Sequence, residues 1–235
     1  MNLIEMNSIS KSYRNIGFET KVLKDVTLHI KEGDYVSIIG PSGAGKSTLM
    51  AIMGCLAQPT SGEYILDYEE VGKLNDRKLS RVRNEKIGFV FQAFHLLPGV
   101  TALENVILPF VYAKNPPSNI KERARELLAK VGLEHRLHHT PGQLSGGEQQ
   151  RVTIARSLVN DPRIILADEP TGNLDSKNGV ETMKTFDNLI KEGKTIVLIT
   201  HDSEVAKHAG RIISILDGQI AADSNVNYEE QARSL

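Results

Sequence analysis

A glycine-rich octapeptide that ends in lysine and serine is the first group of residues in this chain that can do chemistry. Residues 40–47 read Gly-Pro-Ser-Gly-Ala-Gly-Lys-Ser and fit the pattern G-x-x-x-x-G-K-[ST] at every fixed position. The glycines let the backbone curl, so that its N–H groups converge on phosphate oxygens. The loop predicts a site for a nucleoside triphosphate. A glycine-rich turn that matches by chance is the alternative.

Three side chains at the end of this loop have separate expected tasks. Lys46 supplies a mobile positive charge to the β- and γ-phosphates, the Ser47 hydroxyl is placed to bind Mg²⁺, and Thr48 adds a phosphate contact. The expected phosphate-binding residues are Gly40, Ser42, Gly43, Ala44, Gly45, Lys46, Ser47 and Thr48.

Two adjacent carboxylates follow an apolar run further along the chain. The segment 164–169 reads Ile-Ile-Leu-Ala-Asp-Glu and resembles a Walker B segment. Asp168 is expected to hold Mg²⁺ through water, because Mg²⁺ keeps several waters and takes few protein carboxylates. Glu169 is expected to face the γ-phosphate and to orient or deprotonate the attacking water. An exposed turn that happens to carry two acids is the alternative.

Apolar periodicity indicates the elements that must position these residues. Strands alternate with helices through most of the chain, which predicts a largely parallel core sheet. A helical region is expected at 101–136, broken by Pro116 and Pro117. The expected strands are 3–9, 22–30, 35–39, 64–66, 87–91, 163–167, 195–200, 211–216 and 219–222. The other expected helices are 47–56, 76–84, 120–131, 147–159, 179–191 and 204–209.

A second glycine pair lies far downstream of the phosphate loop. Residues 144–148 read Leu-Ser-Gly-Gly-Glu, and here Ser145, Gly146 and Gly147 open a helix whose N-terminus can bind an anion. With residues 149–156, Gln-Gln-Arg-Val-Thr-Ile-Ala-Arg, this segment resembles the signature of ATP-binding cassette (ABC) ATPases. The resemblance implies a homodimer that forms on ATP binding. Each ATP would lie between Lys46 of one chain and the signature, Ser145 to Glu148, of the other.

The same resemblance assigns roles to residues that would attract no notice alone. His201 matches the switch histidine that contacts the γ-phosphate, and Gln92 matches the residue that binds Mg²⁺ or water and senses a membrane partner. Tyr13 matches the aromatic that stacks on adenine; an ordinary tyrosine at a strand end is its alternative. Asp175 belongs to a D-loop, residues 172–175, and a helix-entry turn capped by Asp175 or Ser176 is the alternative there.

The resemblance covers residues 3–222 and implies a single ABC ATPase domain over 1–235. We expect an α/β fold: a P-loop NTPase core with a mainly parallel sheet, an N-terminal antiparallel β subdomain and a helical subdomain that carries the signature. The expected core is 1–92 with 161–224, the helical subdomain is 93–160, and 225–235 is a tail.

Composition limits the class of protein. A net charge of −1 gives no global positive field, so no nucleic-acid partner is expected. The single cysteine, Cys55, fits a reducing compartment and is expected in the core. No segment reaches the ~18–20 apolar residues that cross a bilayer, and the N-terminus lacks the pattern of a signal peptide. We therefore expect a cytoplasmic protein that lies on the inner face of a bacterial membrane through an integral membrane subunit.

Within the ABC family, several segments look closest to the macrolide-export, lipoprotein-release and cell-division (MacB, LolD, FtsE) group. Ala44 and Ala93 depart slightly from the common pattern, and Ala93 bears on the partner contact. The resemblance implies an ATPase that powers export or extraction of an envelope substrate. The segments are 53–56, 59–63, 87–92, 96–98, 101–106 and 169–175.

Three other functions remain open. A mechanical regulator without transport activity would use the same site with another membrane partner. An ATPase of DNA repair or translation would usually show a long coiled coil or two cassettes, and a P-loop nucleotide kinase would lack the signature. A metal site at His135, His138 and His139 is disfavoured, because no cysteine or carboxylate completes it.

Overall fold

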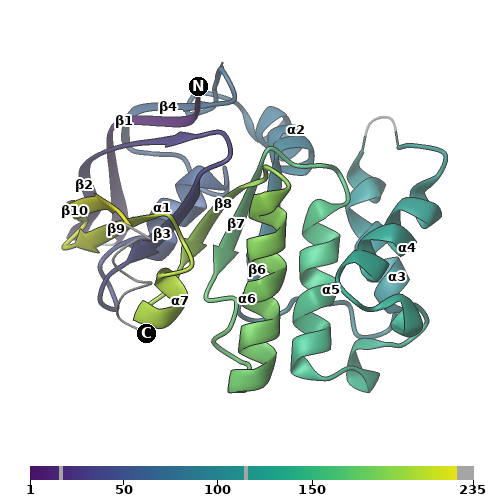
Figure 1. The fold of residues 1–235 in the computed structure, drawn as a ribbon. Helices are drawn as coiled ribbons and strands as arrows, with labels where there is room; N and C mark the ends of the chain where they lie inside the picture. The colour runs from purple at the N-terminus through teal and green to yellow at the C-terminus, as the bar shows by residue number, and fades with distance from the viewer. Residues whose placement is uncertain (16–17, 114–115, 227–235) are drawn as a thin grey trace.

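The computed structural model describes residues 1–15, 18–113 and 116–226. Its centre is a six-stranded sheet in the order β10-β9-β3-β8-β7-β6, in which β9 to β6 run parallel and β10 pairs antiparallel at the edge (Figure 1). The strands are β3 (Tyr35–Ile39), β6 (Ile87–Phe91), β7 (Ile164–Asp168), β8 (Thr195–Ile199), β9 (Arg211–Leu216) and β10 (Gln219–Asn225). The largely parallel core sheet is as predicted.

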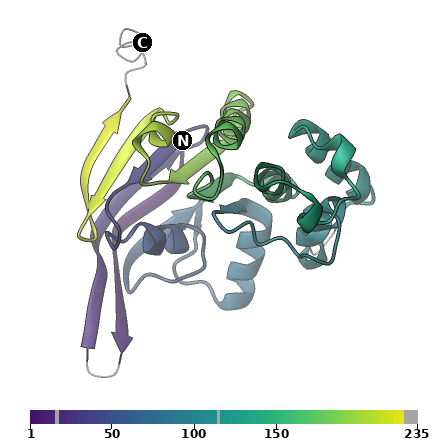
Figure 2. The same cartoon turned by 90° about the horizontal axis from the view of Figure 1, so that it is seen from below.

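A second sheet of four antiparallel strands has the order β2-β1-β4-β5. Its strands are β1 (Asn2–Asn15), β2 (Phe18–Lys31), β4 (Ser61–Leu66) and β5 (Glu69–Glu70). The first two are much longer than the predicted 3–9 and 22–30, and their hairpin projects from the body of the molecule (Figure 2). Alternation of apolar and polar residues marks only the part of each strand that is half-buried, so the projecting part was not predicted.

Helices cover both faces of the core sheet. The α-helices are α1 (Lys46–Met53), α2 (Asp76–Lys86), α3 (Ala102–Ile107), α4 (Ile120–Lys130), α5 (Gly146–Leu158), α6 (Ser176–Lys191) and α7 (Ser203–Ala206). Three 3₁₀ turns are η1 (Leu108–Tyr112), η2 (Glu134–Arg136) and η3 (Pro141–Gln143). Figure 1 shows α3 and α4 at the side of the molecule away from the β1–β2 hairpin, where they form a helical subdomain. Helix α5 packs against β6, α3, α4 and α6, and so joins this subdomain to the core.

Two hydrophobic clusters lie on opposite faces of the core sheet. In β3, Val36 and Ile38 belong to the cluster shared with α1 and the antiparallel sheet, whereas Tyr35 belongs to the cluster shared with α5 and α6. In β7, Leu166 faces the first cluster and Ile165 the second. Burial on both faces explains why these strands are continuous apolar runs rather than alternating ones.

The expected helical region at 101–136 is divided. Helix α3 ends at Ile107, and the chain tightens into η1 with a proline in its first turn. Residues 116–119 are not helical, as the two prolines predicted, while Lys114 and Asn115 lie outside the described residues. Strand β10 reaches Asn225, beyond the predicted 219–222, and residues 227–235 of the expected tail also lie outside the described part of the chain.

Candidate active site

The phosphate loop connects β3 to α1 by a turn that depends on glycine. Gly40 has φ +155, and a Cβ there would lie 2.3 Å from the carbonyl oxygen of Ile215. Gly45 has φ +105, and its Cβ would lie 2.8 Å from Leu23 Cδ2 of β2. Helix α1 begins at Lys46 directly after Gly45. The loop is thus held between β9 and β2, with a helix N-terminus as its last turn.

Lys46 lies folded across the loop. Its ammonium donates to the carbonyl oxygens of Gly40 at 2.7 Å and of Pro41 at 3.0 Å. The same charge acts on Asp168. Burial and the neighbouring Glu169 raise the pKa of Asp168, and the positive charge of Lys46 partly opposes this rise. The loop lysine and the carboxylate at the end of β7 therefore share one electrostatic environment, as the predicted site requires.

The register of the parallel sheet explains why these residues meet. Asp168, the last residue of β7, pairs with Phe91 of β6 on one side and Ile199 of β8 on the other. Ile199 in turn pairs with Ile38 of β3, just before the phosphate loop. Gln92, Glu169, His201 and the loop therefore leave the sheet at the same edge, the carboxyl ends of the strands, where ligands bind in open α/β sheets.

Glu169 and His201 are in direct contact. His201 Nδ1 lies 2.6 Å from Glu169 Oε1, and the Glu169 side chain is 18% exposed against 73% for His201. The backbone of Glu169 turns sharply at φ 46, donates from its N–H to Ile199 at 2.8 Å, and accepts from the Gly172 N–H at 3.0 Å. The backbone of Glu169 is therefore fixed by hydrogen bonds to Ile199 of β8 and to Gly172, and its carboxylate is oriented by one imidazole.

A reciprocal pair of amide hydrogen bonds fixes Gln92. Gln92 Nε2 donates to Asn173 Oδ1 at 3.3 Å, and Asn173 Nδ2 donates to the Gln92 carbonyl oxygen at 3.0 Å. Gly172 leaves the room for this, since a Cβ there would lie 2.7 Å from Gln92 Nε2. Sequence reasoning placed Asn173 only in the D-loop and missed its contact with Gln92. No local pattern signals a bond between residues so distant in the chain.

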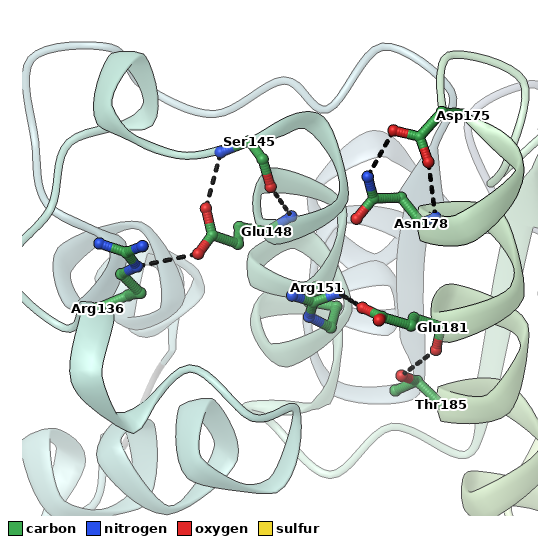
Figure 3. A network of polar contacts seen from close by, with 8 residues as sticks. All are labelled: Arg136, Ser145, Glu148, Arg151, Asp175, Asn178, Glu181 and Thr185. Carbon is green, nitrogen blue, oxygen red and sulfur yellow. Dashed lines mark hydrogen bonds and ion pairs between the residues drawn. The ribbon is translucent and has the colours of Figure 1, made fainter.

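The signature begins α5 with a capping box. Ser145 is the N-cap: its Oγ accepts from the Glu148 N–H at 3.2 Å, while Glu148 Oε2 accepts from the Ser145 N–H at 2.8 Å (Figure 3). Glu148 Oε1 also accepts from Arg136 Nε at 2.9 Å. Burial alone would raise the pKa of Glu148, but the hydrogen bonds from Ser145 and Arg136 outweigh it and lower that pKa. Glu148 thus belongs to the cap as an ionised group.

The other two predicted residues lie away from the strand ends. Asp175 caps α6 by accepting from the Asn178 N–H at 2.9 Å, so the helix-entry role that was the alternative is present. Tyr13 lies on β1, paired with Thr20, with 43% of its surface exposed and Lys11 Nζ 5.0 Å from its ring centre. The structure does not bring Tyr13 into the cluster at the strand ends.

The geometry fits a magnesium site of few protein ligands. Ser47 is the last residue of the phosphate loop, and a cation beside Asp168 would offset the burial and the Glu169 repulsion that raise the pKa of Asp168. Phosphate oxygens and water would have to complete such a shell. Within the described residues, no group of three or more His, Cys, Asp or Glu side chains could hold a metal, and His139 lies 3.1 Å from Arg136.

Comparison with known proteins decides the family. The sequence pattern of the ABC transporter family matches residues 23–172. The chain belongs to the ABC transporter family. It is an ATP-binding cassette ATPase, and the fold agrees: it superposes with a TM-score of 0.87 on the ATP-binding cassette MJ0796, solved as a post-hydrolysis dimer bound to ADP and Pi. The two sequences are 45% identical, and the match covers 95% of this chain and 99% of the other.

Two relatives of this cassette differ in how much of their length it matches. The ABC transporter ATP-binding protein YvrO of Bacillus subtilis is 52% identical over 221 residues, which is 94% of this chain and 96% of YvrO. The macrolide export ATP-binding/permease protein MacB of Escherichia coli is 51% identical over 222 residues, 94% of this chain but 34% of MacB. The cassette thus spans about a third of the MacB proteins that it matches. Among its described residues, no helix has the length and apolar character needed to span a bilayer.

Proposed function

We propose that this cassette binds and hydrolyses Mg-ATP as a homodimer, and that it drives an integral membrane partner in export or in extraction of a lipoprotein or another envelope substrate. It acts at the cytoplasmic face of a bacterial membrane. The observation that carries the hydrolytic part is the Glu169–His201 contact at 2.6 Å, on the sheet edge where the phosphate loop begins.

The residues divide the work of hydrolysis. The phosphate loop, with Lys46, binds the β- and γ-phosphates, and Tyr13 stacks on adenine. Asp168, Ser47 and Gln92 would hold Mg²⁺, which when bound neutralises phosphate charge. Glu169 takes a proton from the attacking water. His201 orients Glu169 through their hydrogen bond and contacts the γ-phosphate. The hydrogen bond of Lys46 to the phosphate loop, the short contact between Glu169 and His201, and the raised pKa of Asp168 support this division.

Dimerisation follows from the position of the signature. Gly146 and Gly147 begin a long helix whose N-terminus favours an anion, yet they lie on the helical side of the molecule and not on the loop that carries Lys46. Two chains arranged head to tail would let Ser145 of one chain meet the ATP held by the other. The dimeric cassettes of MJ0796, at 45% and 47% identity, support this arrangement.

A groove between the core and the helical subdomain is the proposed contact with the membrane partner. It has a volume of about 1020 Å³, and its lining includes Phe89, Phe91 and Tyr112, the last with 78% of its surface exposed. Arg156 also lines it and donates to the carbonyl oxygens of Phe94 at 2.9 Å and His95 at 2.7 Å, just after Gln92. A partner seated here would act on the segment that carries Gln92. The fused permeases of the MacB relatives support such a partner.

Replacing Glu169 by Gln tests the hydrolytic proposal. We expect turnover to fall by the ~10²–10⁴ typical of a lost general base, while ATP binding persists. The variant should sediment as a dimer in Mg-ATP and as a smaller species without it. The control is Glu126→Gln, on the exposed surface of α4. Equal turnover in parent and Glu169→Gln, or a monomer in saturating Mg-ATP, would overturn the proposal.

Identification of the membrane partner separates export from mechanical regulation. The full chain is bound to membranes of its own organism and then purified from them in detergent. One integral membrane protein should co-purify with it. Substitution of Tyr112 by Asp in the groove should weaken that association without changing ATP turnover. If the protein captured were instead a soluble repair or translation factor, the alternative within the same superfamily would replace the transport proposal.

A further inference from the structure

Helix α5, which begins at the signature and is called the signature helix below, contacts α6 at Gly147. A Cβ built on Gly147 would lie 2.2 Å from Asn178 Oδ1, 2.6 Å from its Cγ and 2.8 Å from its Cβ. These are the three atoms nearest to that position, and all belong to Asn178. The Asn178 side chain therefore fills the space that Gly147 leaves in the first turn of α5.

Asp175 fixes the side chain of Asn178 in this position. One carboxylate oxygen of Asp175 accepts from the Asn178 N–H at 2.9 Å, and the other accepts from Asn178 Nδ2 at 2.7 Å (Figure 3). Both hydrogen bonds lower the pKa of Asp175, and the bond from the Asn178 backbone has the larger effect. With Nδ2 turned toward Asp175, the amide oxygen Oδ1 is directed at Gly147. The Asn178 amide is thus hydrogen-bonded to Asp175 through Nδ2 and packed against Gly147 through Oδ1.

The same two helices are joined again one turn further along. Arg151, four residues after Gly147, donates from Nη1 to Glu181 Oε2 at 3.0 Å, and Glu181 follows Asn178 by three residues. Before Asn178, Leu174 of the D-loop lies against Gly146, whose Cβ would be 3.4 Å from Leu174 Cδ2. The contact at Asn178 is therefore the middle of a continuous seam between residues 172–181 and the start of the signature helix.

We propose that Asn178 is a positioning residue that locks the first turn of the signature helix to the D-loop of the same chain. The inference rests on the proposed function. Glu169 and Gly172 are hydrogen-bonded in the segment that runs into the D-loop, and this segment serves the ATP of its own chain. The signature serves the ATP of the partner. Asn178 then makes both parts move as one body, so that a change at one ATP site reaches the other.

A competing explanation of Gly147 makes a different prediction. In that explanation, Gly147 is needed only because ATP of the other chain approaches its backbone. In that case a methyl group at position 147 would harm activity whatever residue stands at 178. If Asn178 is the reason, removing the Asn178 side chain should make room for that methyl group and restore activity. An exchange of side chains between the two positions separates these explanations.

The experiment compares Gly147→Ala, Asn178→Gly and the double variant in the full-length protein. Gly147→Ala keeps the backbone N–H but collides with Asn178, and we expect kcat to fall about 10-fold or more, as overpacking at an interface implies. The double variant should regain activity to within about 3-fold of Asn178→Gly. Glycine is used at 178 because an alanine Cβ would still lie 2.8 Å from the new methyl group.

A second measurement does not depend on how Gly147→Ala folds. In the otherwise unchanged protein, Asn178→Ala should lower kcat. Combined with Glu169→Gln, it should weaken the dimerisation that Mg-ATP drives. The ATP affinity of the monomer should stay unchanged in both, because the phosphate loop is untouched. Asn188→Ala, an exposed position on the same helix, and Gly179→Ala, whose Cβ meets Thr171 only at 3.9 Å, are the matched controls. Both should keep parental kcat and dimerisation.

The outcomes separate the two proposals. If the parent hydrolyses ATP but the double variant stays as inactive as Gly147→Ala, or Asn178→Ala dimerises like its controls, the positioning role is wrong and the proposed function stands. If the parent does not hydrolyse ATP and Glu169→Gln does not dimerise in Mg-ATP, the proposed function itself is wrong. Rescue by the double variant, together with a kcat loss at unchanged ATP affinity in Asn178→Ala, establishes the lock.

Discussion

His201 Nδ1 lies 2.6 Å from Glu169 Oε1, and the two residues follow adjacent parallel strands, β8 and β7. Where Glu169 is ionised, its carboxylate can only accept, and Nδ1 is then the donor of this hydrogen bond. The imidazole is 73% exposed, whereas the carboxylate is 18% exposed. His201 is therefore the solvent-exposed residue of the pair, and Glu169 is the residue whose backbone is hydrogen-bonded within the core.

Replacement of His201 by Ala should lower kcat while ATP still binds. The change removes the hydrogen bond that orients Glu169, and we expect a loss of about 10²-fold, at the low end for general acid–base groups, because Glu169 itself remains. Steady-state phosphate release measures kcat, and equilibrium binding of ATP measures affinity. His138→Ala, in the loop before the signature, is the control. A kcat unchanged by His201→Ala would remove His201 from the mechanism.

The Gln92–Asn173 pair predicts a defect that depends on magnesium. Asn173→Ala removes both hydrogen bonds that fix Gln92, each worth about 0.5–1.5 kcal/mol net. We expect the Mg²⁺ concentration for half-maximal ATPase activity to rise several-fold, and kcat to fall less. Asn173→Asp keeps the acceptor for Gln92 Nε2 and should be intermediate. The same Mg²⁺ dependence in parent and Asn173→Ala would mean that Gln92 needs no fixing.

Sequence alone was sufficient to place residues whose position depends on local chain geometry. The phosphate loop, Asp168 and Glu169 follow strands whose apolar runs are unmistakable, and the parallel order of those strands brings their ends to one edge. The start of a helix at the signature was likewise predicted, and the structure adds a capping box of Ser145 and Glu148, a local pattern that the prediction did not use. In each case the interaction lies within one element or at its end.

Contacts between distant segments were not readable. Asn173 bonds to a residue 81 positions away, and Asn178 packs on a glycine 31 positions earlier in the chain. Each depends on the rotamer of one amide and on how two segments distant in the chain approach each other, and no periodicity encodes either. Helix α7 shows a smaller limit: it ends at Ala206 instead of the predicted 209, because the Ala209 N–H bonds to Ala206 in a tighter turn.

Cys55 should be inert in the folded protein. Its side chain is 4% exposed, and burial raises the pKa of its thiol to about 12, against the lesser opposing effect of Arg83. At pH 8 only about one thiol in 10⁴ would be ionised, and the thiolate is the reactive form. A chromogenic disulfide reagent should therefore report no free thiol in native protein and one per chain in denaturant. Rapid labelling of the native chain would contradict this.

The His208–Asp187 pair should make stability depend on pH in one direction. His208 Nδ1 lies 3.1 Å from both carboxylate oxygens of Asp187, and this hydrogen bond, with the attraction of the charge, raises the pKa of His208 against partial burial. A raised folded pKa adds stability that is complete below the unfolded value of about 6.5 and is lost as pH rises through the folded value.

We therefore expect His208→Gln to cost more stability at pH 5.5 than at pH 8.5. Both side chains are about one-third exposed, at 36% and 33%, so solvent screening should keep the difference below about 1 kcal/mol. Urea unfolding of parent and variant at the two pH values measures it. Asp187→Asn should remove the same pH-dependent term, and the double variant should add nothing further, because either change alone abolishes the pair. A larger loss at pH 8.5 than at pH 5.5 would reverse the sign and show that His208 is stabilised as the neutral form.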